Sequence, residues 1–150
     1  MTPLFKEAHL ECYLDEDAKI LFHVWLKKPT SEQFRSGLTK IFDEYNKHKK
    51  SFTYPLNWLG DTQKLGVVTL DDQGWLEKVW NEMLFVKAGV RAHAVVIGDD
   101  VFAKYAMEKF KNAMQTKYAD KNLHLETFKT KEEAYKWFKN IEKQIAPPSA

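Results

Sequence analysis

The sequence predicts an α/β sandwich with the element order ββαβαβαβα. Short apolar stretches of strand type alternate with longer stretches whose apolar residues recur at helical spacing. Single helices between strands require right-handed crossovers, so most of the sheet should be parallel. The first two strands are separated only by the turn Asp15-Glu16-Asp17. We therefore expect a mostly parallel mixed sheet with an N-terminal antiparallel hairpin and with helices packed on it.

Five segments have the pattern of strands, namely 10–14, 19–26, 56–60, 92–97 and 123–128. The first alternates apolar and polar residues, which is typical of a half-buried strand. The second and fourth are apolar on both faces and should be interior strands. The fifth carries His124 and Glu126 on one face, which favours the edge of the sheet.

Four segments have the pattern of helices, at 31–47, 70–87, 101–118 and from 131 onward. Thr30 and Thr130 each begin a capping box, and Thr69 is a candidate N-cap. Gly89 should end the second helix, and Gly37 indicates close packing or a weak point in the first. In the third helix we expect five residues to face inward: Phe102, Ala106, Phe110, Ala113 and Met114.

The composition indicates one domain over residues 1–150, with a core at about 8–145 and a frayed tail at 146–150. Hydrophobic residues make up 44% of the chain, enough for a core, and 29% charged residues exclude a disordered chain. Because 23 Lys and Arg nearly balance 21 Asp and Glu, we expect no nucleic-acid partner. The N-terminus has no apolar signal segment, and the longest uncharged apolar run is four residues at 94–97. We expect a cytoplasmic protein without a membrane span.

Common catalytic motifs are missing from the sequence. The strand–helix turns contain no GxGxxG, no Walker A lysine and no G-x-S-x-G. Cys12, on an alternating strand, should be a small buried hydrophobe. The histidines lack the spacing of metal ligands, although His23 and His93 lie on interior strands that could bring them together. The acidic pairs 71–72 and 99–100 are explained by the dipoles of the helices that they precede. We expect no catalytic residue, no metal and no cofactor.

The helix at 70–87 has more apolar surface than one buried face requires. At about 100° per residue, six residues cover an arc of roughly 180°: Trp75, Leu76, Val79, Trp80, Met83 and Leu84. Phe85 falls on the opposite side. Either a thick core absorbs all of these residues, or part of the helix covers a second subunit, an apolar ligand or the loop 64–68. We expect an interaction surface for a protein partner or a second copy of the chain, with Trp75, Trp80 and Phe85 as anchors where exposed and Met83 as a further contact.

A second candidate region is the edge of the sheet at the carboxyl ends of the parallel strands, where ligands of open α/β sheets bind. Asp61, Thr62 and Lys64 follow the third expected strand and are candidate partner- or ligand-binding residues. Gly98, Asp99 and Thr130 belong to the same edge, and the helix N-termini at Thr30 and Thr69 suit anions. The lysines at 47–50 and along 104–121 are interpreted as solvated surface.

Three stretches resemble the SpoIIAA-like, STAS/SEC14-type proteins of bacteria: YLDEDAKI at 13–20, WLGDTQKLG at 58–66 and DDQGW at 71–75. The expected element order is similar to that family over about residues 8–145. The resemblance implies a small non-enzymatic domain with a regulatory or protein-interaction role.

Two branches of this fold suggest how such a domain works. Anti-sigma-factor antagonists bind a kinase-like partner and are switched by phosphorylation of a serine in an Asp-Ser-x-Gly motif. The matching region here, TLDD at 69–72, lacks that serine and that glycine, so Thr69 is the nearest hydroxyl. The lipid-binding branch implies an alternative function, the binding of a lipid or small apolar ligand. An enzyme, the third alternative, would need polar groups such as Asp61, Thr62, His23 and His93 to converge.

Overall fold

The structure, a computed structural model, describes residues 1–53 and 55–145, so the expected tail at 146–150 lies outside the described residues. A six-stranded mixed sheet has the order β1-β2-β3-β4-β5-β6. The strands are β1 (Thr2–Lys6), β2 (Leu10–Asp15), β3 (Ile20–Trp25), β4 (Asn57–Asp61), β5 (Ala92–Val96) and β6 (His124–Phe128). Strand β2 is antiparallel to both of its neighbours, β1 and β3, and the strands from β3 to β6 are parallel. The α/β class, the hairpin and the edge position of β6 are confirmed.

The element order differs from the expected one by an additional strand, β1. It pairs with β2 through a register shift between Pro3 and Phe5. Sequence analysis missed it because its residues are mostly exposed or half-buried and so carry no apolar alternation, and because a proline argues against a strand except at an edge. The order is therefore βββαβαβαβα.

The helices begin where their caps predict. They are α1 (Ser31–His48), α2 (Leu70–Trp75), α3 (Val101–Lys117) and α4 (Lys131–Ile141). Thr30 makes both bonds of a capping box with Gln33. Thr130 accepts from the Glu133 amide, but the Glu133 carboxylate accepts from the Lys129 amide, so the second expected box is only half formed.

Helix α2 continues without a break into two π-helical stretches, η2 (Leu76–Trp80) and η3 (Met83–Lys87). The three together form the second helix, 70–87. It ends before Gly89, whose φ of 76° fits the expected terminator. A π-turn takes in one more residue than an α-turn, so residues beyond it are rotated from the positions that 100° per residue gives.

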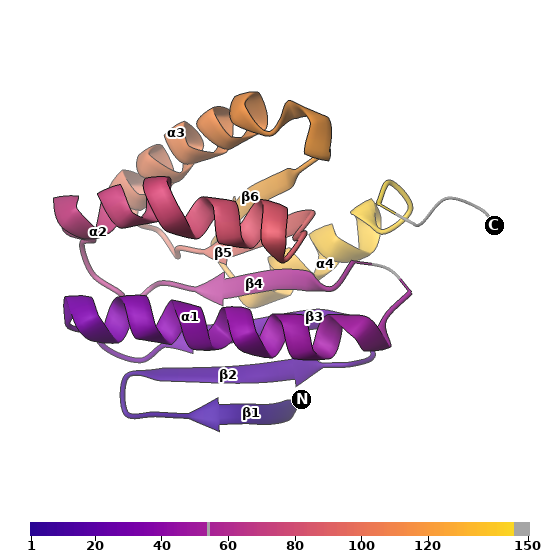
Figure 1. Cartoon of the computed structure of the whole chain (residues 1–150), viewed down its shortest axis with the longest axis horizontal. Helices are drawn as coiled ribbons and strands as arrows, with labels where there is room; N and C mark the ends of the chain where they lie inside the picture. Colours follow the sequence, from indigo (N-terminus) through magenta and orange to yellow (C-terminus); the bar gives the residue numbers. More distant parts are fainter. Residues whose placement is uncertain (54, 146–150) are drawn as a thin grey trace.

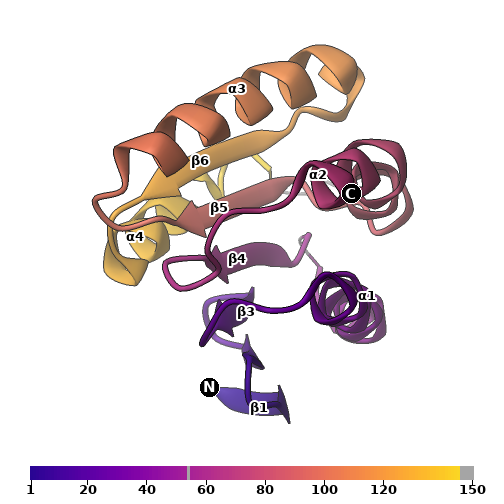
Figure 2. The same ribbon diagram turned by 90° about the vertical axis from the view of Figure 1, so that its left-hand side faces the viewer.

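Helices cover both faces of the sheet, three on one and one on the other. Side chains of α1, the second helix and α3 form one core cluster with the sheet, and side chains of α4 form the other. Figure 2 shows α1 and α2 on one side of the strands and α4 on the opposite side, and Figure 1 shows α1, the second helix and α3 side by side. At Gly37 in α1, a methyl group would lie 2.8 Å from Leu10 and 3.1 Å from Trp25, so this glycine marks close packing of helix on sheet.

Helix α3 faces the core with a different side from the expected one. Met114 is buried and Phe110 half-buried, as expected, but Phe102, Ala106 and Ala113 are exposed, Phe102 to 84%. The half-buried positions are instead Ala103 and Met107. Phe110 and Met114 belong both to the expected inward side of α3 and to the observed one. The side that packs against β6 is the one that leaves Phe102 in solvent.

Candidate functional site

At the carboxyl edge of the sheet, two of the predicted binding residues, Asp61 and Thr62, are bonded within their own loop or to the neighbouring strand β5. Asp61 Oδ1 accepts from the Gln63 amide at 3.1 Å and from Gln63 Nε2 at 3.2 Å. Thr62 Oγ1 donates to the Val96 carbonyl at 3.2 Å. Lys64 is exposed. These three residues lie close together along the chain, but the side-chain oxygens of Asp61 and Thr62 already make hydrogen bonds within the protein.

The helix N-termini at this edge are capped by side chains of the chain itself. The hydroxyls of Thr30, Thr69 and Thr130 accept from the third amide of their helices. Asp100 Oδ1 accepts from two amides of α3, each at 3.0 Å. Thr69, the expected phosphorylation candidate, is therefore an N-cap. One amide at each of three helix starts, and two at the start of α3, therefore already have side-chain acceptors.

Asp72 joins the first two helices through a cluster that was not expected. Its Oδ1 accepts from Ser31 Oγ at 2.6 Å and from Arg35 Nε at 2.8 Å, and its amide donates to Thr69. The hydrogen bond from Ser31, followed by those from Arg35 and Thr69, lowers the pKa of this buried carboxyl. Asp72 is thus an ion-pair partner between α1 and α2, and the helix dipole explains only part of its role.

The two interior histidines flank one tryptophan. His23 lies 5.7 Å and His93 lies 6.4 Å from Trp58, measured between ring centroids. Burial lowers the pKa of His23 to about 3, with a further contribution from His93, and lowers that of His93 to about 4. Both rings are therefore neutral near pH 7.

Gly60 gives the His23 ring its space, because a methyl group there would lie 2.7 Å from it. Side chains alternate between the faces of a strand. Asp61 therefore points to the α4 face, away from His23, so these two polar groups do not converge.

Cys12 is fully buried, as expected. Burial, with a contribution from Glu44, raises the pKa of its thiol to about 12. Among the residues that the structure describes, no group of three or more His, Cys, Asp or Glu side chains could hold a metal ion.

Two of the predicted anchors on the second helix are buried in their own chain. Trp80 is 5% exposed and packs on Phe42 of α1 and on Trp58. Phe85 is 0% exposed and packs on Phe110 and Tyr118 at α3. Trp80 and Phe85 were expected to act as anchors only where exposed. Because both are buried, they are not anchors for a partner.

The broad apolar arc has a physical cause, since the second helix lies between α1 and α3 and packs sideways on both. The π-helical stretches also rotate Phe85 into the core. Trp75 stays half-buried, with Phe34 at 6.4 Å and the Arg35 guanidinium over its ring.

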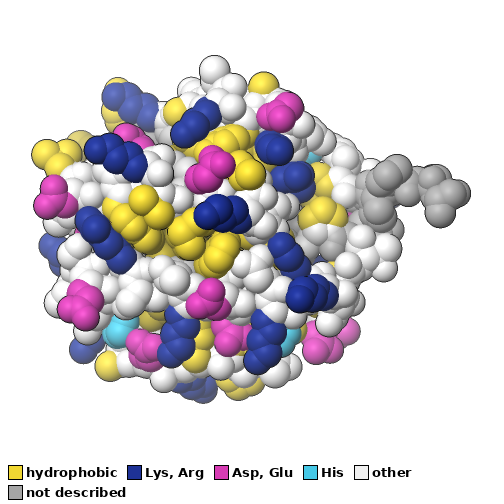
Figure 3. Space-filling model, in the orientation of Figure 1, with side chains coloured by type: hydrophobic (Ala, Val, Ile, Leu, Met, Phe, Trp, Pro, Cys, Tyr) yellow, Lys and Arg dark blue, Asp and Glu magenta, His cyan; other side chains and the backbone are white. Residues whose placement is uncertain are grey.

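Part of the arc, together with Val86, nevertheless remains at the surface. Val79 is 42% and Val86 is 39% exposed, and Leu76 and Met83 are half-buried. We call these four residues the apolar strip. In Figure 3, hydrophobic side chains gather over the second helix, where Figure 1 places it. Val67 and Leu70, more than 80% exposed, extend the apolar surface where the loop enters the helix.

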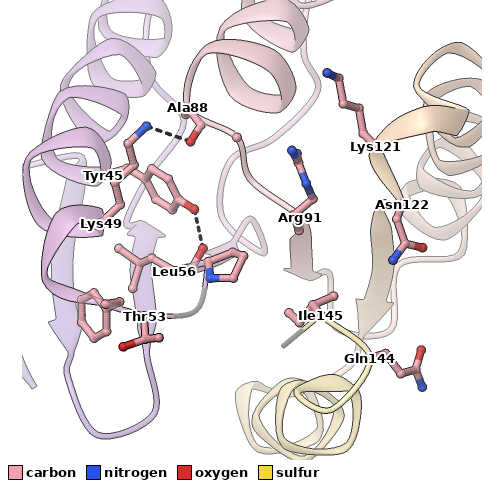
Figure 4. A pocket seen from close by; sticks show the side chains of 13 residues that line it. Tyr45, Lys49, Thr53, Leu56, Ala88, Arg91, Lys121, Asn122, Gln144 and Ile145 are labelled. Atoms are coloured by element: carbon pink, nitrogen blue, oxygen red, sulfur yellow. Dashed lines mark hydrogen bonds between the residues drawn. The ribbon is translucent and has the colours of Figure 1, made fainter. Parts of the chain in front are cut away.

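The larger cavity lies at the opposite, amino edge of the parallel strands, where sequence analysis placed no site. It is an open pocket of about 520 Å³. Figure 4 shows side chains from the end of α1, the end of the second helix, the 3-10 turn η4 (Ala119–Lys121) and the end of α4 around it. Three of the side chains that line it are cations: Lys49, Arg91 and Lys121. Lys49 and Lys121 belong to the lysines interpreted as solvated surface, and Arg91 lies in no motif.

A second, smaller cavity beside the loop 65–69 measures about 40 Å³, close to the volume of one water molecule. It has no room for an apolar ligand. No helix in the described ranges 1–53 and 55–145 has the length and hydropathy to cross a bilayer.

The chain was compared with protein-family models, with curated proteins and with solved structures. No family model, no curated protein and no solved structure matches it.

Proposed function

We propose that the chain is a non-enzymatic interaction domain, of the SpoIIAA-like type, that pairs with a second copy of itself through the apolar strip. The observation that carries the proposal is that Val79 and Val86 lie open to solvent on a helix whose inner side is already fully packed. Exposed apolar surface of this kind is typical of interaction sites. The three stretches that resemble the SpoIIAA-like family support the same class of function.

A second copy fits the strip because the strip is self-complementary. Around a two-fold axis near the middle of the helix, Leu76 would lie beside the partner's Val86, and Val79 beside the partner's Met83. The exposed charges are also of both signs, with Glu77 and Glu82 alternating with Lys78 and Lys87. In an antiparallel pair, the acids of one copy approach the lysines of the other.

Sedimentation equilibrium over a dilution series tests this proposal. The wild-type chain should show a monomer–dimer equilibrium, and Val79→Glu should weaken it by about a hundredfold, because the axis places the new charge in the interface twice. The control is Asn140→Glu, which adds the same charge to the exposed end of α4 on the other face of the sheet. A wild-type chain that stays monomeric throughout, or equal weakening by both variants, would contradict the proposal.

A second candidate function is the binding of a lipid or small apolar ligand. The observation that favours it is the apolar wall of the large pocket, formed by Phe52, Leu56 and Ile145. Native mass spectrometry of freshly purified chain should then show a co-purified ligand. A mass equal to that of the chain alone in every preparation would remove this candidate.

A further inference from the structure

The large pocket at the amino edge has an unusual balance of charge. Its cations come from separate parts of the chain: Lys49 follows α1, Arg91 precedes β5 and Lys121 precedes β6. No Asp or Glu is among the described residues that line the pocket. These three cations therefore face a cavity whose described lining supplies no carboxylate to pair with them.

The contacts within the described residues leave donors on each cation. Lys49 Nζ donates to the Ala88 carbonyl at 3.0 Å. Arg91 Nη1 lies 3.4 Å from the carbonyls of Phe85 and Val90. The nearest carboxylate to Lys121 Nζ is that of its exposed neighbour Asp120, at 4.0 Å. A lysine has three donors and an arginine has five, so most of the donor capacity at the pocket is not used by these contacts.

The helix ends at this edge do not cancel the positive charge. The C-termini of α1 and the second helix reach the pocket at Tyr45 and Ala88, and each carries a partial charge of roughly −0.5. Together they supply roughly −1 against three positive side chains, so the side chains outweigh these helix ends. The contacts of Lys49 and Arg91 with backbone carbonyls therefore offset the partial charges of the helix ends, and the pocket keeps a net positive charge.

The size and the walls of the pocket define the rest of its occupant. At about 520 Å³ it falls within the range of small-molecule sites. An inorganic anion, little larger than a water molecule of about 30 Å³, would fill only a small part of it. Phe52, Leu56 and Ile145 form the apolar part of the lining; Figure 4 labels Leu56 and Ile145.

We propose that this pocket binds an organic phosphate, with the phosphoryl group held by Lys49, Arg91 and Lys121 and an apolar or aromatic group against Phe52, Leu56 and Ile145. The inference deepens the ligand-binding candidate, on whose apolar wall it rests, and does not depend on self-association. Its ligand is either a soluble phosphate ester or the phosphate headgroup of a lipid, since both present the same chemistry to the cations.

Titration calorimetry on the full chain separates the parts of this proposal. Phenyl phosphate should bind saturably, while inorganic phosphate and phenol should each bind at least about tenfold more weakly. Raising the salt concentration should weaken the binding of phenyl phosphate. In a parallel experiment, sedimentation with phosphatidylcholine vesicles that contain phosphatidic acid tests whether the ligand is a lipid headgroup. Binding to the vesicles without binding to phenyl phosphate would assign the pocket to a lipid headgroup.

Matched variants locate the binding. Lys49→Gln and Lys121→Gln should each weaken the binding of phenyl phosphate by about tenfold. If the chain binds the vesicles, each variant should weaken that binding by the same factor. Lys104→Gln, the control, removes an exposed lysine near the N-terminus of α3 at the other edge of the sheet and should change nothing. Unchanged thermal melting of each variant shows that it is folded.

Three results would overturn the inference. One is the failure of both phenyl phosphate and the vesicles to bind, and another is equal weakening by Lys104→Gln. The third is binding of phenol as tight as that of phenyl phosphate, which would leave apolar-ligand binding standing and remove the phosphate.

Discussion

The two edges of the parallel sheet use their polar side chains in opposite ways. At the carboxyl edge, Asp61 and the four N-caps are bonded to their own loop and helices, and Thr62 is bonded to strand β5. At the amino edge, three cations surround an open pocket and bond mainly to carbonyls. Strand polarity alone therefore does not locate a ligand site. A ligand site is expected at the edge where hydrogen-bond donors are not already used by contacts within the fold.

Lowering the pH should reduce the free energy of unfolding more than any of the substitutions below. The groups responsible are two histidines in the core, between the two edges of the sheet. The folded chain holds His23 at a pKa of about 3 and His93 at about 4, both below the ordinary value of 6.5. The unfolded chain therefore takes up protons that the folded chain does not, so these two histidines lower the free energy of unfolding as the pH falls below about 6.5 and add no pH dependence well above it. From about pH 7 to about pH 5, each histidine should cost about 2 kcal/mol.

Urea unfolding at a series of pH values measures this loss. In His93→Phe, whose ring keeps the aromatic contacts with Trp58, Phe85 and Phe110, about half of the loss should disappear. A variant with the same pH dependence as the wild type would show that the core is open to water, and the contrast between a closed interior and an open edge would fail.

Asp72→Ala should produce the next largest effect and tests whether the carboxyl edge is structural. The substitution removes a buried acceptor of bonds from Ser31 and Arg35, and about 2–3 kcal/mol of unfolding free energy should be lost. Asp71→Ala is the matched control, because the Asp71 side chain is exposed one position away. Chemical denaturation compares the two, and equal losses would mean that the helix dipole alone explains both acids.

Lys121→Gln should produce the smallest effect on stability, less than about 0.5 kcal/mol, because its one carboxylate contact within the part of the chain that the structure describes is long and exposed. Thermal unfolding without added ligand measures it. A loss as large as that of Asp72→Ala would place Lys121 among the structural residues and erase the difference between the edges.

Local signals in the sequence were sufficient for most elements of the fold. The capping box at Thr30 and the glycine at position 89 fix where helices begin and end through bonds between residues that are close along the chain. These signals need no knowledge of tertiary structure. Strand β1 is different, because its pairing with β2 stabilises a segment that has no apolar alternation of its own.

Features that depend on packing were predicted less well. Phe102 and Phe110 both lie on α3, and hydrophobicity alone could not decide which side of that helix faces the core. The burial of Trp80 and Phe85 depends on neighbouring helices and on π-turns, neither of which leaves a periodic signal. The pocket is the extreme case, since Lys49, Arg91 and Lys121 converge only after three crossovers of the chain.

The outer strand β1 also has a consequence for how the molecule behaves in a crowded solution. Among the strands of residues 1–53 and 55–145, β1 has a neighbour on one side only, and an open side of this kind can recruit strands from other chains into aggregates. Pro3 has no amide hydrogen to offer, the register shift beside it distorts the strand, and Lys6 places a charge at its end. These three features should make the rim of the sheet a poor template for amyloid-like growth.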